Sequence, residues 1–234
     1  LHGIMRTRAF EQDDAHVFCR EQEVEGEVAS FIALLGEVYR ELGFPDYEVA
    51  LATRPAVRAG DDATWDWSEA KLGDAARQCG LVPQINPGEG AFYGPKLEFA
   101  LRDRLGRSWQ CGTVQLDGVL PQRLEASYVA PDGSRARPLM IHHAIFGSLS
   151  RMIAILLEHH GGVLPFWLSP DQVAVAPISK DHAGYGADVL AAFEDAGIRA
   201  VAYNGADTLS RRIVAAHEMA VPVMAIVGGR EMRD

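Results

Sequence analysis

Hydrophobic residues in the first 160 positions follow two different periods. Spacings of three and four residues, which place apolar side chains on one helix face, predict helices over 21–42, 62–78 and 145–160. Alternation of apolar and polar residues predicts strands over 47–53, 97–102, 108–117, 125–129 and 137–142. Short turns join the last four strands, which must therefore pair antiparallel, because a parallel pair needs a long crossover. The pattern predicts an α+β domain built on an antiparallel sheet.

The pattern changes after residue 164. A continuous apolar strand over 173–178 is followed by alternating helices and strands at 184–196, 198–203, 207–219 and 221–227. Strand–helix alternation of this kind predicts a parallel sheet with both faces covered. We therefore predict two domains, 1–164 and 165–234, of which the second is α/β.

Polar side chains crowd the segment from residue 5 to residue 19. If this segment is one strand, alternate side chains project to the same face: Arg6, Arg8, Phe10, Gln12, Asp14 and His16. Over a covered sheet, that face becomes a polar wall with cations at one end and a possible metal ligand at the other. On an open sheet it is an ordinary charged strand, and His16 is a core histidine. The segment alone does not distinguish these two interpretations.

Three further features carry chemistry. The loop at 87–96 contains three glycines and two prolines and presents Tyr93 and Lys96. Strict alternation along 108–117 predicts one face for Cys111, Thr113, Gln115 and Asp117. Arg151 lies in an otherwise apolar helix, where an unpaired charge is costly, so we expect an anionic partner, either a carboxylate or a phosphate.

Composition narrows the class of protein. The formal charge is −10, so any contact with an RNA backbone has to come from local patches. No apolar run approaches the ~20 residues needed to cross a bilayer. Three cysteines without a CxxC pair favour a reducing compartment, and we predict a cytoplasmic protein. The chain begins without Met, which leads us to expect a longer native protein.

Three stretches together resemble threonyl-tRNA synthetases. They are R-T-R-A-F-E-Q-D-D-A-H-V-F-C, the loop G-E-G-A-F-Y-G-P-K with Q-C-G-T-V-Q-L-D, and M-I-H-H-A-I-F-G-S-L-S-R. The resemblance covers essentially the whole chain and implies a class II synthetase catalytic domain followed by an α/β anticodon-binding domain. It further implies a ligase of protein biosynthesis that uses ATP to activate L-threonine and then loads tRNA(Thr). Enzymes of this type are generally homodimers.

The resemblance also implies a role for particular residues. Those expected to bind threonine are Gln12, Asp14, Tyr93 and Gln115. Those expected to bind ATP, with Mg²⁺, are Arg6, Phe10, Gln12, Gln110, Thr113 and Arg151. Those expected to act in catalysis are Arg6, Lys96 and Arg151.

A zinc ion is implied by the same resemblance. His16 and His142 match the family's two histidine ligands, and open positions on the metal would bind the amino and hydroxyl groups of threonine. The family's third ligand, a cysteine, has no counterpart in this chain. We therefore expect it before Leu1, in a native protein that begins upstream.

One departure keeps other functions open. Met219 and Ala220 stand where the family commonly has two arginines before the last strand. The alternatives are a synthetase-like paralogue that binds threonine or its adenylate for regulation, carrier loading or resistance, and a non-catalytic tRNA- or partner-binding module. The module is disfavoured, because binding alone does not require metal-binding and phosphate-binding residues together.

Overall fold

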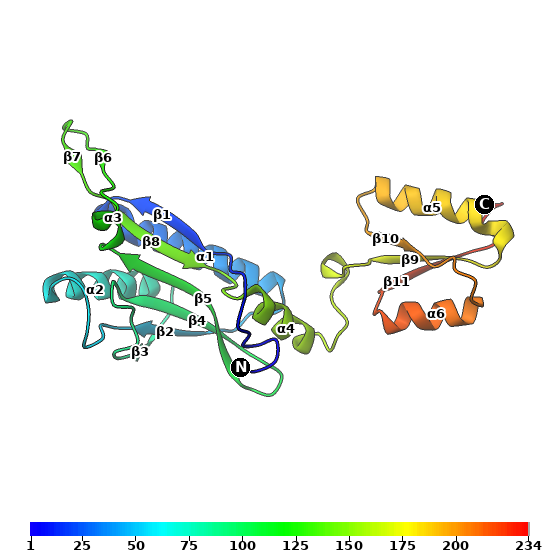
Figure 1. Cartoon of the computed structure of the whole chain (residues 1–234), viewed down its shortest axis with the longest axis horizontal. Coiled ribbons are helices and arrows are strands. Elements are labelled where there is room, and N and C mark those ends of the chain that lie inside the picture. Colours follow the sequence, from blue (N-terminus) through cyan, green and yellow to red (C-terminus); the bar gives the residue numbers. More distant parts are fainter. Residues whose placement is uncertain (234) are drawn as a thin grey trace. The chain divides into compact units, whose positions relative to one another are not determined.

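The computed structural model describes residues 1–233 and contains two compact units, Leu1–Ile155 and a second that begins at Leu156 (Figure 1). The division falls within helix α4 (Leu149–His159). The predicted domain boundary at 164/165 stays a prediction.

A six-stranded sheet forms the centre of the first unit, in the order β1-β8-β5-β4-β2-β3. Its strands are β1 (Ala15–Cys19), β2 (Glu48–Ala52), β3 (Gln84–Asn86), β4 (Lys96–Arg102), β5 (Ser108–Asp117) and β8 (Leu139–Ala144). Every neighbouring pair is antiparallel except β2 with β3, which is parallel. The predicted α+β fold is thus confirmed. The sheet is mixed rather than purely antiparallel, because strand β3, which was not predicted, pairs with β2 after the helical crossover that a parallel pair requires.

Two helices cover one face of this sheet. They are α1 (Val24–Glu41), preceded by the 3₁₀ turn η1 (Glu21–Glu23), and α2 (Asp62–Gln78). The ring of Phe31 on α1 meets Phe99 on β4, with centroids 6.1 Å apart. Along β4 the burial alternates, so Leu97 and Phe99 are fully buried while Lys96 and Glu98 point to the other face. The face that α1 and α2 do not cover therefore carries polar side chains.

The chain leaves the sheet after β5. The carboxylate of Asp117 accepts hydrogen bonds from the backbone N–H groups of Val119 and Leu120, where α3 (Leu120–Arg123) begins. The strand predicted over 125–129 is therefore reduced to β6 (Tyr128–Val129). It pairs with β7 (Arg135–Ala136) in a separate hairpin.

The second unit has a three-stranded parallel sheet, as predicted. Its strands β9 (Val173–Pro177), β10 (Ala200–Ala202) and β11 (Val223–Val227) lie in the order β10-β9-β11. Helices α5 (Ala183–Asp195) and α6 (Leu209–Glu218) lie on opposite faces (Figure 1). Short 3₁₀ turns complete the unit, η2 (Phe166–Leu168) and η3 (Lys180–His182). Among residues 1–233, no helix is both long and apolar enough to span a membrane.

Candidate active site

Four polar side chains form a line across the first sheet. His16 on β1 pairs in register with His142 on β8, His142 pairs with Gln115 on β5, and Gln115 pairs with Lys96 on β4. Directly opposed residues project to the same face. Residues from distant parts of the chain are therefore neighbours on the face opposite the two helices.

A β-bulge corrects the prediction for β5. The register against β4 shifts between Phe99 and Ala100, so that Gly112 and Gln110 have partners and Cys111 is the extra residue. Cys111 is buried and interrupts the alternation of Thr113 and Gln115, although all three lie along the same cavity. Gln110 takes its place, and its side-chain amide donates a 3.0 Å hydrogen bond to the Thr113 hydroxyl.

The opening segment is the second correction, because only its end, Ala15–Cys19, is a strand. The backbone before Ala15 is irregular and is hydrogen-bonded to the residues that precede and begin α4. The Asp13 carboxylate accepts from the N–H groups of Ile145, at 2.7 Å, and Phe146, at 3.0 Å. The carbonyl of Glu11 accepts from the N–H of Leu149. These bonds replace the ladder of a neighbouring strand.

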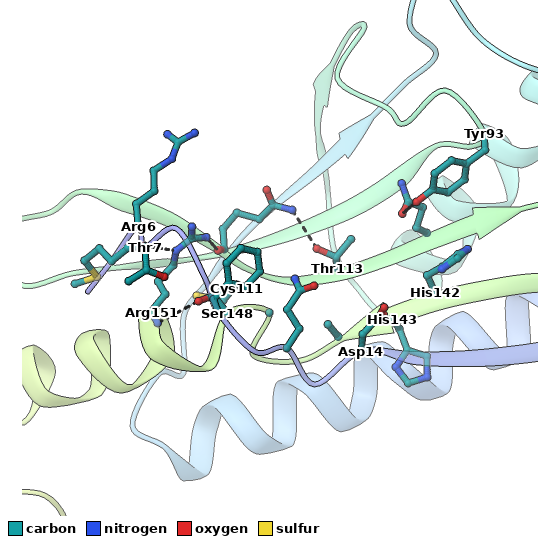
Figure 2. A pocket seen from close by; sticks show the side chains of 17 residues that line it. Arg6, Thr7, Asp14, Tyr93, Cys111, Thr113, His142, His143, Ser148 and Arg151 are labelled. Carbon is teal, nitrogen blue, oxygen red and sulfur yellow. Dashed lines mark hydrogen bonds between the residues drawn. The ribbon is translucent and has the colours of Figure 1, made fainter. Parts of the chain in front are cut away.

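A cavity of about 410 Å³ lies over this face (Figure 2). Ten of the predicted site residues line it: Arg6, Phe10, Gln12, Asp14, Tyr93, Gln110, Thr113, Gln115, His142 and Arg151. The arginines lie at one end, and Tyr93 and His142 lie at the other. The two remaining predicted residues, Lys96 and His16, continue the line of side chains beside the cavity.

The histidine end is polar and partly buried. The rings of His16 and His142 meet edge to face, with centroids 4.6 Å apart. Nε2 of His142 lies 2.9 Å from Oδ2 of the fully buried Asp117, and Nε2 of His16 lies 3.8 Å from the Asp14 carboxylate. Burial opposes the charge of Asp117, but hydrogen bonds from His142 and from two backbone N–H groups outweigh it and lower the pKa of this carboxyl.

This end of the site brings together the two histidines that were expected to bind a metal, His16 and His142. Within residues 1–233, no group of three or more His, Cys, Asp or Glu side chains is arranged to hold a metal ion. A carboxylate on the second nitrogen of a histidine is nevertheless the usual support of a metal-binding imidazole. The pair His16 and His142, with Asp117 behind it, fits a metal ion as a partial ligand set.

Tyr93 is placed by a close approach of its loop to the sheet. A Cβ atom on the next residue, Gly94, would lie 1.7 Å from the carbonyl oxygen of Leu116, so only glycine fits there. The Tyr93 hydroxyl donates to Oε1 of Gln115 at 2.9 Å, and its ring lies 5.5 Å from that of His142. Burial raises the pKa of the Tyr93 phenol, which remains protonated as a donor at neutral pH.

The opposite end is cationic. Arg151 projects from α4, donating from Nε to the carbonyl of Met5 at 2.9 Å and from Nη1 to that of Gln110 at 2.6 Å. Gly147 allows α4 to begin this close to β5, because its φ is 61° and a Cβ would lie 2.4 Å from the carbonyl of Cys111. Arg151 therefore has backbone partners and faces the cavity.

Lys96 has a partner of its own. Its ammonium group lies 2.6 Å from the Glu98 carboxylate on the same face of β4. Lys96 is next to Gln115 in the line but is not among the residues that line the cavity.

Sequence reasoning missed several residues that organise the site. Asp13 and Ser148 were not singled out, and Asp117 was placed on the correct face without a role. Asp13 had one available signal, since it is the neighbour of Asp14 in a polar segment and would point the opposite way. The role of Ser148, which lines the cavity and bridges to Gln12, had no sequence signal.

Comparison with known proteins identifies the family of the chain. Residues 1–160 match the family model of the tRNA synthetase class II core domain (G, H, P, S and T), and residues 172–234 match that of the anticodon binding domain. The chain belongs to the class II tRNA synthetase core family.

Individual relatives narrow the comparison within this family. It is 52% identical over 235 residues to the threonine–tRNA ligase of Granulibacter bethesdensis and 53% identical over 232 residues to that of Rhodospirillum rubrum. Each match covers 99% of this chain and 36% of the relative, so the chain spans about a third of these proteins. The crystal structure of the RNA binding domain of threonyl-tRNA synthetase from Cryptosporidium parvum Iowa II matches with a TM-score of 0.93 and 39% identity, over 100% of this chain and 59% of that one.

Proposed function

We propose that the protein is a threonine–tRNA ligase, which activates L-threonine with ATP and transfers the threonyl group to tRNA(Thr). One observation carries the proposal: a single cavity has arginines at one end and Asp14, Tyr93 and His142 at the other. A nucleoside triphosphate needs a cationic environment and an amino acid needs a polar one, and the two must lie side by side for them to react. About 50% identity to threonine–tRNA ligases over nearly the whole chain supports threonine as the amino acid.

At the polar end, the Asp14 carboxylate would accept a hydrogen bond from the threonine hydroxyl. His16 and His142 would be two of the ligands of a Zn²⁺ ion, because Asp117 binds Nε2 of His142 and leaves the other ring nitrogen available. When bound, zinc would supply open coordination positions that distinguish threonine from valine, which has no hydroxyl. An apolar pocket alone discriminates poorly between such isosteres.

At the cationic end, Arg6 and Arg151 would bind the phosphates of ATP, with Mg²⁺. Phe10, whose side chain is 55% exposed at the cavity, would stack on the adenine, near Gln110 and Thr113. The threonine carboxylate then attacks the α-phosphorus, the bond to the bridging oxygen breaks, and pyrophosphate leaves. No protein nucleophile is required, since positioning and charge stabilisation suffice.

The second unit would bind tRNA. Its match to an anticodon-binding domain supports this role. We further propose a homodimer in the cytoplasm, where the three free cysteines remain reduced. The second step would transfer the threonyl group from AMP to a hydroxyl of the terminal ribose of tRNA(Thr).

Pyrophosphate exchange dependent on threonine, followed by charging of tRNA(Thr), tests the proposal in the whole protein. Both activities are expected, with valine activated far less than threonine. Asp14→Asn should remove the preference for threonine. Asp74→Asn, which changes a half-exposed carboxylate on α2 that is paired with Arg77, should not. Exchange without charging would favour the paralogue, and neither activity would favour the binding module.

A further inference from the structure

Trp109 lies outside the predicted site but in contact with it. It stands near the start of β5, one residue before Gln110. Two guanidinium groups lie over its indole ring, that of Arg151 at 5.8 Å and that of Arg107 at 5.5 Å from the ring centroid. Both distances are within the range of cation–π attraction, which is strongest for tryptophan.

The indole is locked by the turn between β4 and β5. Its Nε1 donates to Oδ2 of Asp103 at 2.8 Å. The Asp103 side chain is fully buried, and its Oδ1 accepts from the backbone N–H groups of Leu105 and Arg107, each at 2.9 Å. The backbone of the turn thus fixes the carboxylate, and the carboxylate fixes the plane of the ring.

Arg151 has few other restraints. Its two hydrogen bonds go to carbonyl oxygens of Met5 and Gln110, which are neutral acceptors. No carboxylate within residues 1–233 forms an ion pair with it. Its charge is therefore available to a phosphate, while the indole restricts where the guanidinium can lie. A flexible arginine gains most from such preorganisation.

We propose that Trp109 is a positioning residue for Arg151, and that Asp103 sets its orientation. The inference rests on the proposed function, since it takes ATP phosphate as the anion that Arg151 binds. Trp109 does not touch the nucleotide; it holds the guanidinium ready at the cationic end of the cavity. The same hairpin that supplies Gln110 to the site would thereby also orient its arginine.

The test compares Trp109→Ala and Trp109→Phe in threonine-dependent pyrophosphate exchange by the whole protein. Loss of the ring should raise the KM for ATP about 5- to 30-fold and leave the KM for threonine unchanged. Phenylalanine retains an aromatic face but lacks the Nε1–H that binds Asp103, so it should restore only part of the loss. The matched control is Trp67→Ala, because Trp67 is also half-buried and carries Lys71 over its ring at 5.9 Å, away from the cavity.

A double-mutant cycle identifies the path of the effect. If Trp109 acts through Arg151, Trp109→Ala should cost much less in an Arg151→Lys background than in the wild type. Additive effects, or an unchanged KM for ATP in Trp109→Ala, would overturn the inference while leaving the proposed function intact. An equal rise of the KM for ATP in Trp67→Ala would also overturn the inference, because the effect would then reflect a general loss of packing.

Calorimetric binding of ATP separates the two proposals. If the wild-type protein binds ATP but exchanges no pyrophosphate, the ligase proposal fails, and a weaker Kd for ATP in Trp109→Ala still supports the positioning role. An unchanged Kd in that case rejects it. If the wild-type protein binds no ATP, both proposals fail together.

Discussion

The two sheets of this protein use their faces differently. In the first unit, helices cover one face only, and the other presents the line of His16, His142, Gln115 and Lys96. In the second unit, α5 and α6 cover both faces, and every residue of β9 is buried. A sheet with one uncovered face can carry chemistry at mid-strand, whereas a sheet covered twice leaves chemistry to its strand ends.

Two helical arginines show the same contrast. Arg151 in the first unit faces the cavity and has two carbonyl partners beside it. Arg212 on α6 is 9% exposed, and its Nη1 donates to the carbonyls of Pro177 and Tyr203 at the ends of β9 and β10. We infer that the first arginine serves a ligand and the second holds strands together.

Replacing each arginine by alanine should separate these roles, with the largest effects expected here. Arg151→Ala should reduce pyrophosphate exchange about 10²- to 10³-fold, because a cation on developing charge is lost. Its loss of thermal stability should be smaller than that of Arg212→Ala, because water can reach the carbonyl that Arg151 binds on Gln110. Arg212→Ala should destabilise the second unit by about 2–3 kcal/mol, because two carbonyls lose a charged donor. Exchange assays and thermal unfolding check both. If Arg151→Ala lowered the thermal stability but left pyrophosphate exchange unaltered, Arg151 would have the structural role instead.

A reciprocal exchange of isosteric residues tests the covered and uncovered faces directly. Val175→Thr places a hydroxyl in β9, where Val175 is 1% exposed, and should cost about 1–3 kcal/mol. Thr113→Val on the open face of β5 should change stability by less than about 1 kcal/mol, because one hydrogen bond to Gln110 is lost where the group is partly exposed. Equal costs in urea unfolding would contradict the comparison.

The turn of the first sheet should respond to acid. Burial opposes ionisation of Asp103, but hydrogen bonds from Trp109, Arg107 and Leu105 outweigh it and lower its pKa to about 2. A depressed folded-state pKa stabilises the native state above the unfolded value, near 4, and this contribution is lost as the pH falls toward 2. Asp103→Asn should therefore cost about 1–2 kcal/mol at neutral pH and progressively less below pH 4. Unfolding at several pH values measures the difference, and a constant difference would refute the role of the charge.

The smallest effect concerns the end of α6. Val221 donates to the carbonyl of Ala216 and Ala220 to that of His217, a Schellman motif whose left-handed residue is Ala220, with φ 53°. Ala220→Gly should stabilise the second unit by about 0.5–1 kcal/mol, because glycine adopts this conformation without strain.

The matched control for Ala220→Gly is Gly197→Ala after α5. Gly197 has φ 75° and open space around its missing Cβ, so only conformational strain differs. Gly197→Ala should lower the free energy of unfolding of the second unit by a similar amount, measured by thermal unfolding. Stabilisation by both substitutions would contradict the explanation.

Most helices and the parallel second sheet were predictable, because apolar periods of 3.6 and 2.0 are local properties of the chain. The misses have a common cause. Residues 5–14 alternate like a strand, but Asp13 binds backbone N–H groups more than 130 positions away. The strand predicted over 125–129 is only Tyr128–Val129, because the chain turns after Asp117 into α3.

The candidate site was predictable in membership rather than in arrangement. The residues implied by the resemblance include ten that line one cavity. The bulge at Cys111, which brings Gln110 beside Thr113, depends on pairing between β4 and β5 and leaves no signature in either strand alone. The support of Arg151 by Trp109 likewise joins residues from different elements.

In β4 and β9, the sequence by itself determined which residues face a core and which are polar. Lys96, Leu97, Glu98 and Phe99 alternate, and β9 does not. Only the tertiary structure decided that His16, His142, Gln115 and Lys96 form one line, since strand register depends on partners far away in the chain. Side-chain direction follows from local backbone sterics, whereas a binding site requires contacts that no local pattern specifies.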